Sequence, residues 1–340
     1  MSITETSKIL SGDLTCVNQL RPSRHPWAWD LYIKSQDNIW HPNEVAMQED
    51  ITQWRTGALT EDEKLIVKRT IGFFSGTESL VGNNLLLSIF RWVCDGECRM
   101  YLIRQAGEEA IHNHMVVHVA DSLDLNVKEV FEAYKSIPSI KAKDEFLMRI
   151  TSDLGRAGFD ITSTSGKQEF IRNAVAFYVI CEGILFYSGF AMMLQFSRRN
   201  LMNNLCEQIN YTLRDESLHI EFGAKLINTI IEQEPDIWTE EFKNELRALI
   251  REACELEVEY AKDVLPKGIM GMNSTMFIDY MNYIGNRRAN SIGLGDLFPG
   301  AIRNPFEWMS ETIDLRKSVK FFERKVTEYK LSASSLIDDL

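Results

Sequence analysis

Two long apolar segments of this sequence each contain one carboxylate near the middle, and this feature restricts the fold more than any other. Glu78 is the only charged residue in TIGFFSGTESLVGNNLLLSIF, and Glu182 is the only ionisable residue of note in AVAFYVICEGILFYSGFAMMLQF. A carboxylate that is buried without a partner destabilises a fold strongly, so such groups are normally paired or bound to a metal ion. The fold must therefore bring a partner or a cation to both glutamates.

Two further segments carry the pattern E-x-x-H, and they pair Glu109 with His112 and Glu216 with His219. A spacing of three residues places both side chains on one face of a helix, one turn apart. Each pattern follows one of the apolar glutamates, 31 residues later in the first half of the chain and 34 residues later in the second. The order carboxylate, E-x-x-H, carboxylate, E-x-x-H indicates a two-fold functional repeat.

This is the ligand set of the ferritin-like dimetal carboxylate bundles, in which two helices give one Glu each and two others give an E-x-x-H. Four carboxylates can balance and bridge two cations, and two imidazoles complete the coordination while positions stay open for dioxygen. Oxygen-rich sets with some nitrogen suit iron and manganese. His114 and His118 fall outside the repeated pattern and are interpreted as non-ligands. The predicted metal ligands are Glu78, Glu109, His112, Glu182, Glu216 and His219.

Hydrophobic periodicity predicts an all-α, ferritin-like helix bundle with extra helices, because few stretches alternate with the period of two that a strand requires. The capping-box pattern of Thr60 and Glu63 predicts the start of the first long helix. We expect a single domain, with an N-terminal wrapping segment over 1–50 that holds one short helix, a helical core over 51–300 and a C-terminal segment over 301–340 that ends in a flexible tail. The predicted helices cover about 60–90, 97–122, 127–136, 141–154, 168–196, 201–233, 239–264 and 274–291, with a loop at Gly155, Gly158 and 163–166.

Composition excludes several classes of protein. The chain has 49 Asp and Glu against 37 Lys and Arg, and this acidic balance without a basic block argues against a nucleic-acid binder. The segment 174–196 is long enough to cross a membrane, but Glu182 near its middle favours a buried helix. The cysteines form no C-x-x-C pair, and the N-terminus has no signal pattern, so we expect a cytoplasmic protein.

The motifs resemble one family: the small, radical-generating subunit of class I ribonucleotide reductase. The resemblance runs over nearly the whole chain and includes FFSGTESLVGNNL, RQAGEEAIHNH, CEGILFYSGF, YTLRDESLH, LEVEYAKD, MFIDY and NPFEWMSE. Glu78 stands where most of the family has Asp, as in the chlamydial-type subgroup. The resemblance implies a homodimer that works with a large catalytic subunit. It also implies that the tail, with Ile337, Asp338, Asp339 and Leu340, docks on that subunit.

Further roles follow from the resemblance, each beside a simpler alternative. Asp215 would accept a hydrogen bond from His112 and from Trp40, which makes a path for electrons and protons; otherwise Asp215 is a helix-surface charge and Trp40 a buried anchor. Tyr329 matches the tail tyrosine that passes the radical to the large subunit, or it is an ordinary exposed tyrosine. Tyr211 would relay electrons while the cofactor assembles, or it serves packing alone.

One departure from the family concerns the radical itself. Where common members have the radical tyrosine, four residues after the first E-x-x-H histidine, this chain has Val116, and Phe186 and Phe190 match the apolar lining of that pocket. The chlamydial-type enzymes have Phe there and store the oxidising equivalent on a manganese–iron centre. We therefore expect a dinuclear centre with manganese and iron, and otherwise with two manganese or two iron ions.

Two other functions remain open from the residues. A stand-alone dimetal oxidase or oxygenase that acts on a long-chain lipid fits the loss of the tyrosine, but not Tyr329 or the Trp40–Asp215 pair. Iron storage, as in ferritins, is the non-enzymatic alternative. Ferritin chains, however, are much shorter than this one. The leading hypothesis is a small subunit of ribonucleoside-diphosphate reductase, whose oxidised centre starts the reduction of ribonucleotides in a large subunit.

Overall fold

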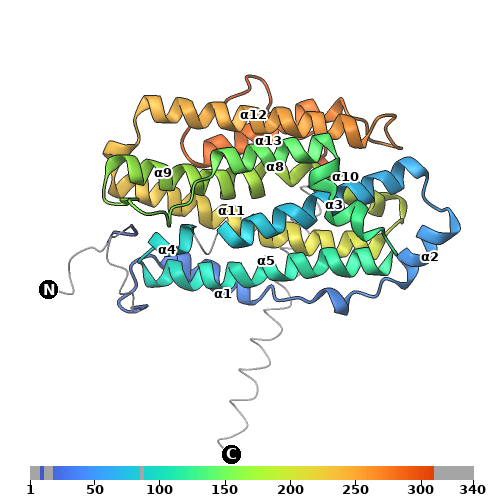
Figure 1. Ribbon diagram of the computed structural model, residues 1–340, viewed down its shortest axis with the longest axis horizontal. Coiled ribbons are helices and arrows are strands. Elements are labelled where there is room, and N and C mark those ends of the chain that lie inside the picture. The colour runs from blue at the N-terminus through green and yellow to red at the C-terminus, as the bar shows by residue number, and fades with distance from the viewer. Residues whose placement is uncertain (1–7, 11–17, 85–87, 310–340) are drawn as a thin grey trace, which may run out of the picture. The chain divides into compact units, whose positions relative to one another are not determined.

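The computed structural model describes residues 8–10, 18–84 and 88–309, and Figure 1 shows their arrangement. Over these ranges every long regular element is a helix and no β-strand is present, which confirms the predicted fold class. The chain divides into two compact units, Met1–Arg303 and Asn304–Leu340. All elements and sites described below lie in the first unit. The predicted docking tail falls outside the described residues.

Within the described residues, the bundle is built from four helices of 24 to 31 residues and a set of shorter elements. In chain order these are α1 (Pro26–Gln36), η1 (Pro42–Glu44), α2 (Gln48–Thr56), α3 (Glu61–Asn84), α4 (Phe90–Trp92), α5 (Gly96–Ser122), α6 (Val127–Phe131), α7 (Ala133–Ser136), α8 (Pro138–Ile150), α9 (Thr164–Ala174), η3 (Val175–Leu185), α10 (Tyr187–Leu194), η4 (Phe196–Arg199), α11 (Asn203–Gln233), η5 (Pro235–Ile237), α12 (Glu240–Val264) and α13 (Met276–Ser291).

Local sequence signals account for most helix boundaries. The capping box at the start of α3 is present, since Glu63 N–H donates to Thr60 Oγ1 and Thr60 N–H donates to a Glu63 carboxylate oxygen. The start of α5 is capped by Asp95, which accepts from Cys98 N–H. α12 ends at Val264, shortly before Pro266 as predicted.

Several boundaries differ from the prediction. Helix α2 was not predicted, because it is short and mostly polar. It ends at Gly57, whose φ of 78° is in the left-handed region. The predicted loop over 163–166 is already helical from Thr164, because Ser163 accepts a hydrogen bond from Gly166 N–H and caps α9. The segment predicted over 127–136 is two short helices, α6 and α7, and α8 starts earlier than expected, at Pro138.

The apolar segment predicted as one helix over 168–196 is interrupted. Between α9 and α10 the chain winds as a π-helix, η3, in which all eleven residues are buried. Such winding is rare and occurs frequently at functional sites. Two basic side chains from other helices donate to its carbonyl oxygens: Lys143 Nζ to Leu185 O at 2.9 Å and Arg288 Nε to Gly183 O at 2.8 Å. These contacts pair backbone groups in the part of η3 that carries Glu182.

Close packing around η3 depends on a glycine of the neighbouring helix α11. A Cβ at Gly223 would lie 2.0 Å from Cγ of Tyr178 in η3, so a larger residue there would displace the tyrosine ring. The apolar stretch Thr164–Arg199 is long enough to cross a membrane, but its most apolar window is completely buried inside the protein. This burial favours the core-helix interpretation over a membrane span.

Four elements form the centre of the bundle. α3 packs on α5, α5 packs on α11, and α11 packs on η3. In Figure 1, α5 lies beside α3 and α11, and α12 and α13 lie on the far side of the bundle from α5. α1 packs on α5 and on α11, so part of the N-terminal segment covers the outer face of this central group.

Candidate metal centre

The six predicted ligands come from the four central elements. Glu78 lies on α3, the first E-x-x-H on α5, Glu182 on η3 and the second E-x-x-H on α11. Each of the six side chains belongs to a residue that is at most 1% exposed. The structure therefore brings together residues from four separate parts of the chain, and it shields all of them from water.

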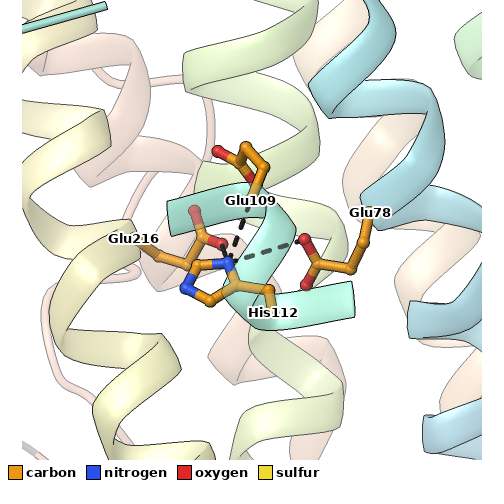
Figure 2. Close-up of side chains that lie close together, drawn as sticks. All are labelled: Glu78, Glu109, His112 and Glu216. Carbon is orange, nitrogen blue, oxygen red and sulfur yellow. Dashed lines mark ion pairs between the residues drawn. The ribbon is translucent and has the colours of Figure 1, made fainter. Parts of the chain in front are cut away.

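The first group surrounds Nδ1 of His112 (Figure 2). A carboxylate oxygen of Glu216 lies 3.2 Å from this nitrogen, and oxygens of Glu78 and Glu109 lie 3.6 Å from it. The four ligand atoms are close enough to one another to hold one metal ion. They come from three helices, so the group forms only when α3, α5 and α11 are packed.

The second group surrounds Nδ1 of His219. Oxygens of Glu216 and Glu109 lie 3.2 Å and 3.3 Å from this nitrogen, and an oxygen of Glu182 lies 3.8 Å from it. Glu109, Glu182 and His219 together could hold a second ion. The centroids of the two histidine rings are 6.0 Å apart, so the two groups are neighbours.

Glu109 and Glu216 belong to both groups. Each carboxylate presents one oxygen to His112 and its other oxygen to His219. Carboxylates can bind two ions in this way, one through each oxygen. Glu78 faces only the first group and Glu182 only the second. The arrangement could hold two adjacent cations, with Glu109 common to both groups and Glu216 in contact with both histidines.

Several polar atoms in these groups have no hydrogen-bond partner although they are buried. These atoms are Glu78 Oε1 and Oε2, Glu109 Oε2, His112 Nδ1, Glu182 Oε2 and Glu216 Oε1. Buried polar atoms are normally paired, and leaving one unpaired costs about 1–3 kcal/mol or more for a charged group. A pair of divalent cations would satisfy these atoms, and four carboxylates with two imidazoles fit iron or manganese. The residues present therefore fit a dinuclear metal centre.

Burial and the neighbouring histidines shift the pKa values of three of these carboxylates, Glu78, Glu182 and Glu216. Burial raises the pKa of Glu78 to about 8, although His112 opposes the shift. Burial and the charge of Glu216 raise the pKa of Glu182 well above its usual value. Burial acts in the same direction on Glu216, but its contacts with His219 and His112 outweigh this effect and bring its pKa to about 2. Two divalent cations would supply positive charge to all four carboxylates.

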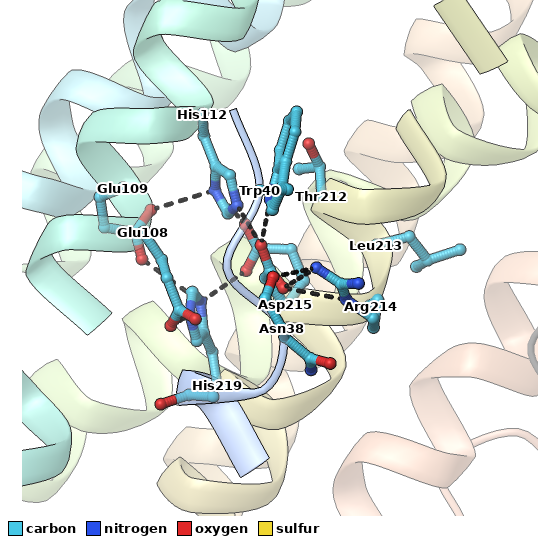
Figure 3. Close-up of polar contacts among 12 residues, drawn as sticks. Asn38, Trp40, Glu108, Glu109, His112, Thr212, Leu213, Arg214, Asp215 and His219 are labelled. Atoms are coloured by element: carbon cyan, nitrogen blue, oxygen red, sulfur yellow. Dashed lines mark hydrogen bonds and ion pairs between the residues drawn. The ribbon is translucent and has the colours of Figure 1, made fainter. Parts of the chain in front are cut away.

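Asp215 connects the first group to Trp40 (Figure 3). Trp40 Nε1–H donates to Asp215 Oδ2 at 2.7 Å, and Nε2 of His112 lies 3.5 Å from the same oxygen. Burial alone would raise the pKa of Asp215, but its contacts with His112, Arg214 and Trp40 lower it. Asp215 is fully buried, so it is not the helix-surface charge of the simpler alternative.

The two tyrosines predicted to relay electrons have different outcomes. The ring of Tyr211 lies 5.2 Å from that of Trp40, between centroids, and its hydroxyl donates to Glu207 at 2.5 Å. Tyr211 is therefore next to Trp40, which is compatible with electron relay and with packing. Tyr329 lies outside the described residues.

Val116, Phe186 and Phe190, which are predicted to line one pocket, are all buried and apolar. Val116 is 1% exposed, and Phe186 and Phe190 are fully buried. The ring centroids of these two phenylalanines are 6.0 Å apart, and both rings contact Phe74. Their side chains carry no group that could pair with water or hold a proton. The role of this pocket in the function remains a prediction.

Sequence reasoning missed two polar residues on α5. Gln105 Nε2 donates to Glu182 at 3.1 Å and to Glu109 at 3.4 Å, while Gln105 Oε1 accepts from Tyr178. Glu108 lies 3.0 Å from Nε2 of His219. Gln105 is four residues before Glu109 and therefore lies on the same helix face. This spacing could have predicted that Gln105 lies near the ligands. Glu108 directly precedes a predicted ligand, but no local spacing in the sequence links it to His219.

The family of the chain follows from comparison with known proteins. A family model described as the ribonucleotide reductase small chain matches residues 17–305. The chain belongs to this family. This small chain is 49% identical over 318 residues to the ribonucleoside-diphosphate reductase subunit beta of Chlamydia pneumoniae, which covers 94% of this chain and 91% of that protein.

Solved structures of ribonucleotide reductases have the same fold as this small chain. The R2 subunit from Clostridium botulinum superposes with a TM-score of 0.82 at 25% identity, over 90% of this chain and 93% of that one. A putative class I ribonucleotide reductase from Bacillus halodurans superposes with a TM-score of 0.76 at 27% identity, over 84% of this chain and 99% of that one. The family match confirms the predicted fold and reductase class, and it disfavours lipid oxidation and iron storage.

Proposed function

We propose that this small chain generates the oxidising equivalent for a class I ribonucleoside-diphosphate reductase and is active only with a large catalytic subunit. The proposal rests on two consecutive contacts, from His112 to Asp215 and from Asp215 to Trp40. We call these contacts the Asp215 row, and they lie beside two groups of residues that could each hold a cation. When bound, a dinuclear metal centre would supply a stored one-electron oxidising equivalent, formed with dioxygen or a reduced oxygen species. The large subunit would use that equivalent to start the reduction of ribonucleotides to deoxyribonucleotides.

The residues of this row would move an electron and a proton together. Trp40 is 4% exposed and its indole N–H donates to the carboxylate of Asp215 at 2.7 Å. An indole that gives up an electron becomes a stronger acid at nitrogen, and Asp215 is placed to take that proton. Tyr329 would connect Trp40 to the large subunit, as the resemblance implies.

A Trp40→Phe substitution tests this role. The variant keeps an aromatic ring but loses the N–H, so Asp215 loses one donor while both cation groups keep all their ligands. We expect normal metal content by elemental analysis and loss of nucleotide reduction when the large subunit is added. Reduction at the wild-type rate would refute the path through Trp40.

We further propose that this chain belongs to the subgroup without a radical tyrosine and that its centre contains manganese. Val116 has no oxidisable group, and the 49% identity to the Chlamydia pneumoniae beta subunit supports the subgroup. A manganese–iron pair is the first candidate, and a pair of manganese or of iron ions is the alternative. Protein expressed with both metals should contain manganese and show no persistent tyrosyl signal by electron paramagnetic resonance. A strong tyrosyl signal from active, iron-only protein would contradict this.

We propose that the protein is a homodimer in the cytoplasm. One face of α5, apolar except for His114, supports the dimer, because Ile103 is 50% exposed and Val117 is 43% exposed, with exposed Gly107 and Ala110 between them. A second copy of the chain would cover this apolar face. Four described cysteines, Cys98, Cys181, Cys206 and Cys254, are buried thiols, as in a reducing compartment. A concentration-independent monomer in analytical ultracentrifugation would refute the dimer.

The tail should dock on the large subunit. Deletion of 332–340 is expected to abolish reductase activity of the mixed subunits and to leave the metal content unchanged. Tyr329→Phe should keep subunit binding and stop turnover, because only the redox step is removed. Full activity after the deletion would exclude the docking role.

A further inference from the structure

Glu108 contacts the histidine of the second group on the side that faces away from the other ligands. Its Oε2 lies 3.0 Å from Nε2 of His219, while Nδ1 of the same ring faces Glu216 at 3.2 Å and Glu109 at 3.3 Å. Figure 3 shows the ring of His219 between Glu108 and the contacts that its other nitrogen makes. Nε2 of His219 therefore contacts a residue outside the predicted ligand set, and Nδ1 contacts residues inside it.

The other carboxylate oxygen of Glu108 contacts an arginine. The carboxylate is 0% exposed, and its Oε1 forms an ion pair with Arg104 at 3.1 Å. Arg104 is itself 12% exposed at the side chain and donates to Ser35 O at 3.4 Å, at the end of α1. The contacts form a row from His219 through Glu108 and Arg104 to the backbone of α1.

The Asp215 row, on the other histidine, has the same order of groups: a histidine, a carboxylate, an arginine and a backbone carbonyl. Asp215 contacts His112 and pairs with Arg214 at 3.1 Å, and Arg214 donates to the backbone carbonyl of Asn38. The two rows are reciprocal, because α11 supplies the carboxylate for the histidine of α5, and α5 supplies the carboxylate for the histidine of α11. Both rows end on carbonyls between 35 and 38.

We propose that Glu108, held by Arg104, is a positioning residue for His219. It accepts the Nε2 proton, so the ring carries its hydrogen on that nitrogen and presents the lone pair of Nδ1 to the cation. Metal-bound histidines usually have such an outer partner, and its loss commonly weakens metal binding 10–100-fold. This inference rests on the proposed function, since the cation is one of the two ions of the dinuclear centre.

The charges of the two rows also fit the centre. Four ligand carboxylates together with Asp215 and Glu108 carry six negative charges. Two divalent cations and the side chains of Arg104 and Arg214 carry six positive charges, with both histidines neutral. Loss of Glu108 would leave the named groups with an excess positive charge. The rows differ in one respect, because only Asp215 contacts an indole, so we assign metal positioning and not electron transfer to Glu108.

Manganese titration of the full chain under argon tests the proposal. Free Mn²⁺ is followed by electron paramagnetic resonance for the wild type, Glu108→Ala and Glu108→Gln. We expect two ions for each wild-type chain, and in Glu108→Ala one site that is weakened 10–100-fold while the other is unchanged. Glu108→Gln should lie between them, because its amide oxygen can still accept the Nε2 proton and only the charge is lost.

A matched control removes a carboxylate charge without touching the site. Glu221 is on the same helix as His219 but its side chain is 41% exposed and pairs with Lys225, so Glu221→Gln should bind manganese like the wild type. Equal weakening of both sites in Glu108→Ala would indicate general damage and overturn the proposal. Because Gln has almost the same volume as Glu, Glu108→Gln remains a test if Glu108→Ala fails to fold.

The proton position on His219 gives a readout that a structural role alone would not change. The chain has six histidines, so selective ¹⁵N-histidine labelling gives a readable spectrum of the protein loaded with diamagnetic Zn²⁺. We expect His219 to carry its proton on Nε2 in the wild type and in Glu108→Gln, and that signal to be lost or exchange-broadened in Glu108→Ala, with His112 unchanged.

The two possible failures are distinguishable. Wild-type affinities and an unchanged His219 signal in Glu108→Ala overturn only the role of Glu108. A wild-type protein that binds neither manganese nor iron overturns both this role and the proposed function.

Discussion

At the scale of single residues, the predicted ligands are not equivalent. Glu109 and Glu216 each present an oxygen to both histidines, whereas Glu78 faces only His112. Removal of a shared carboxylate should therefore weaken both predicted cation sites, and removal of a terminal one should weaken mainly its own site. This difference can be measured without turnover.

Glu78→Ala and Glu109→Ala should differ in metal stoichiometry. We expect Glu78→Ala to keep about one ion for each chain, because the His219 group retains all its ligands, and to lose activity. Glu109→Ala should weaken both sites. Elemental analysis after gel filtration checks this, with Glu221→Gln as the control for the loss of an exposed carboxylate. Equal stoichiometry in the two alanine variants would contradict the assignment of Glu109 as shared.

At the scale of elements, the π-helix η3 depends on charges that other helices bury beside it. Lys143 of α8 is completely buried, donates to Leu185 O and pairs with Glu257 of α12. Glu257 in turn accepts from Ser188 of α10. Burial lowers the pKa of Lys143 and raises that of Glu257 to about 7, with each group partly offsetting the shift of the other. The pair therefore places a hydrogen-bond donor at the last carbonyl of η3. Its burial also carries a large desolvation penalty.

Replacing one partner of this ion pair should destabilise the fold more than replacing both partners. Removing one partner of a buried ion pair typically costs about 3–5 kcal/mol, because the other charge stays buried and unpaired. We expect Lys143→Met to lower the thermal unfolding midpoint strongly, and Lys143→Met with Glu257→Gln to recover most of the loss. The double variant would still leave Leu185 O without its donor, which costs about 1–3 kcal/mol. Scanning calorimetry at fixed protein and metal concentration provides the measurement.

The single variant serves as the reference for the double one. If both variants unfold at the same temperature, the pair is not what stabilises the end of η3. The exposed pair of Arg149 and Glu252 is a control, since exposed ion pairs contribute about 0–1 kcal/mol and Arg149→Met should have little effect.

How far the sequence predicts each element depends on where its determinants lie. The long helices and the E-x-x-H pairs follow from local spacing and were predicted. The π-helical winding of η3 was not, because Lys143 and Arg288 reach its carbonyls from helices far away in sequence. The contact of Glu108 with His219 joins residues 111 positions apart and was missed for the same reason. Helix α2 lacks the apolar period that predicts a helix.

At the scale of the whole molecule, the centre of the bundle holds several carboxylates that no water can reach. All four ligand glutamates are at most 1% exposed, and the folded chain must keep them close together. Bound cations would stabilise the folded state, because they pair these groups and have no comparable site in the unfolded chain. The stability of the bundle and the occupancy of its centre are therefore linked.

Removal of metal should lower the unfolding temperature of the whole bundle. We expect a chelator to shift the thermal midpoint downward, and Mn²⁺ added back to restore it in proportion to the logarithm of free metal. Glu109→Ala provides the control, since a chelator should shift its midpoint much less than that of the wild type. An unchanged wild-type midpoint after verified metal removal would contradict the link.

The burial of the six ligands also has a consequence in time. An ion can reach side chains at most 1% exposed only when helices of the bundle separate locally, so uptake and release follow the rate of that opening. An ion bound at these residues would therefore enter and leave at the rate of that local opening and not at the rate of its diffusion. The time that a metal titration needs to reach equilibrium would then measure how often the centre of the bundle opens.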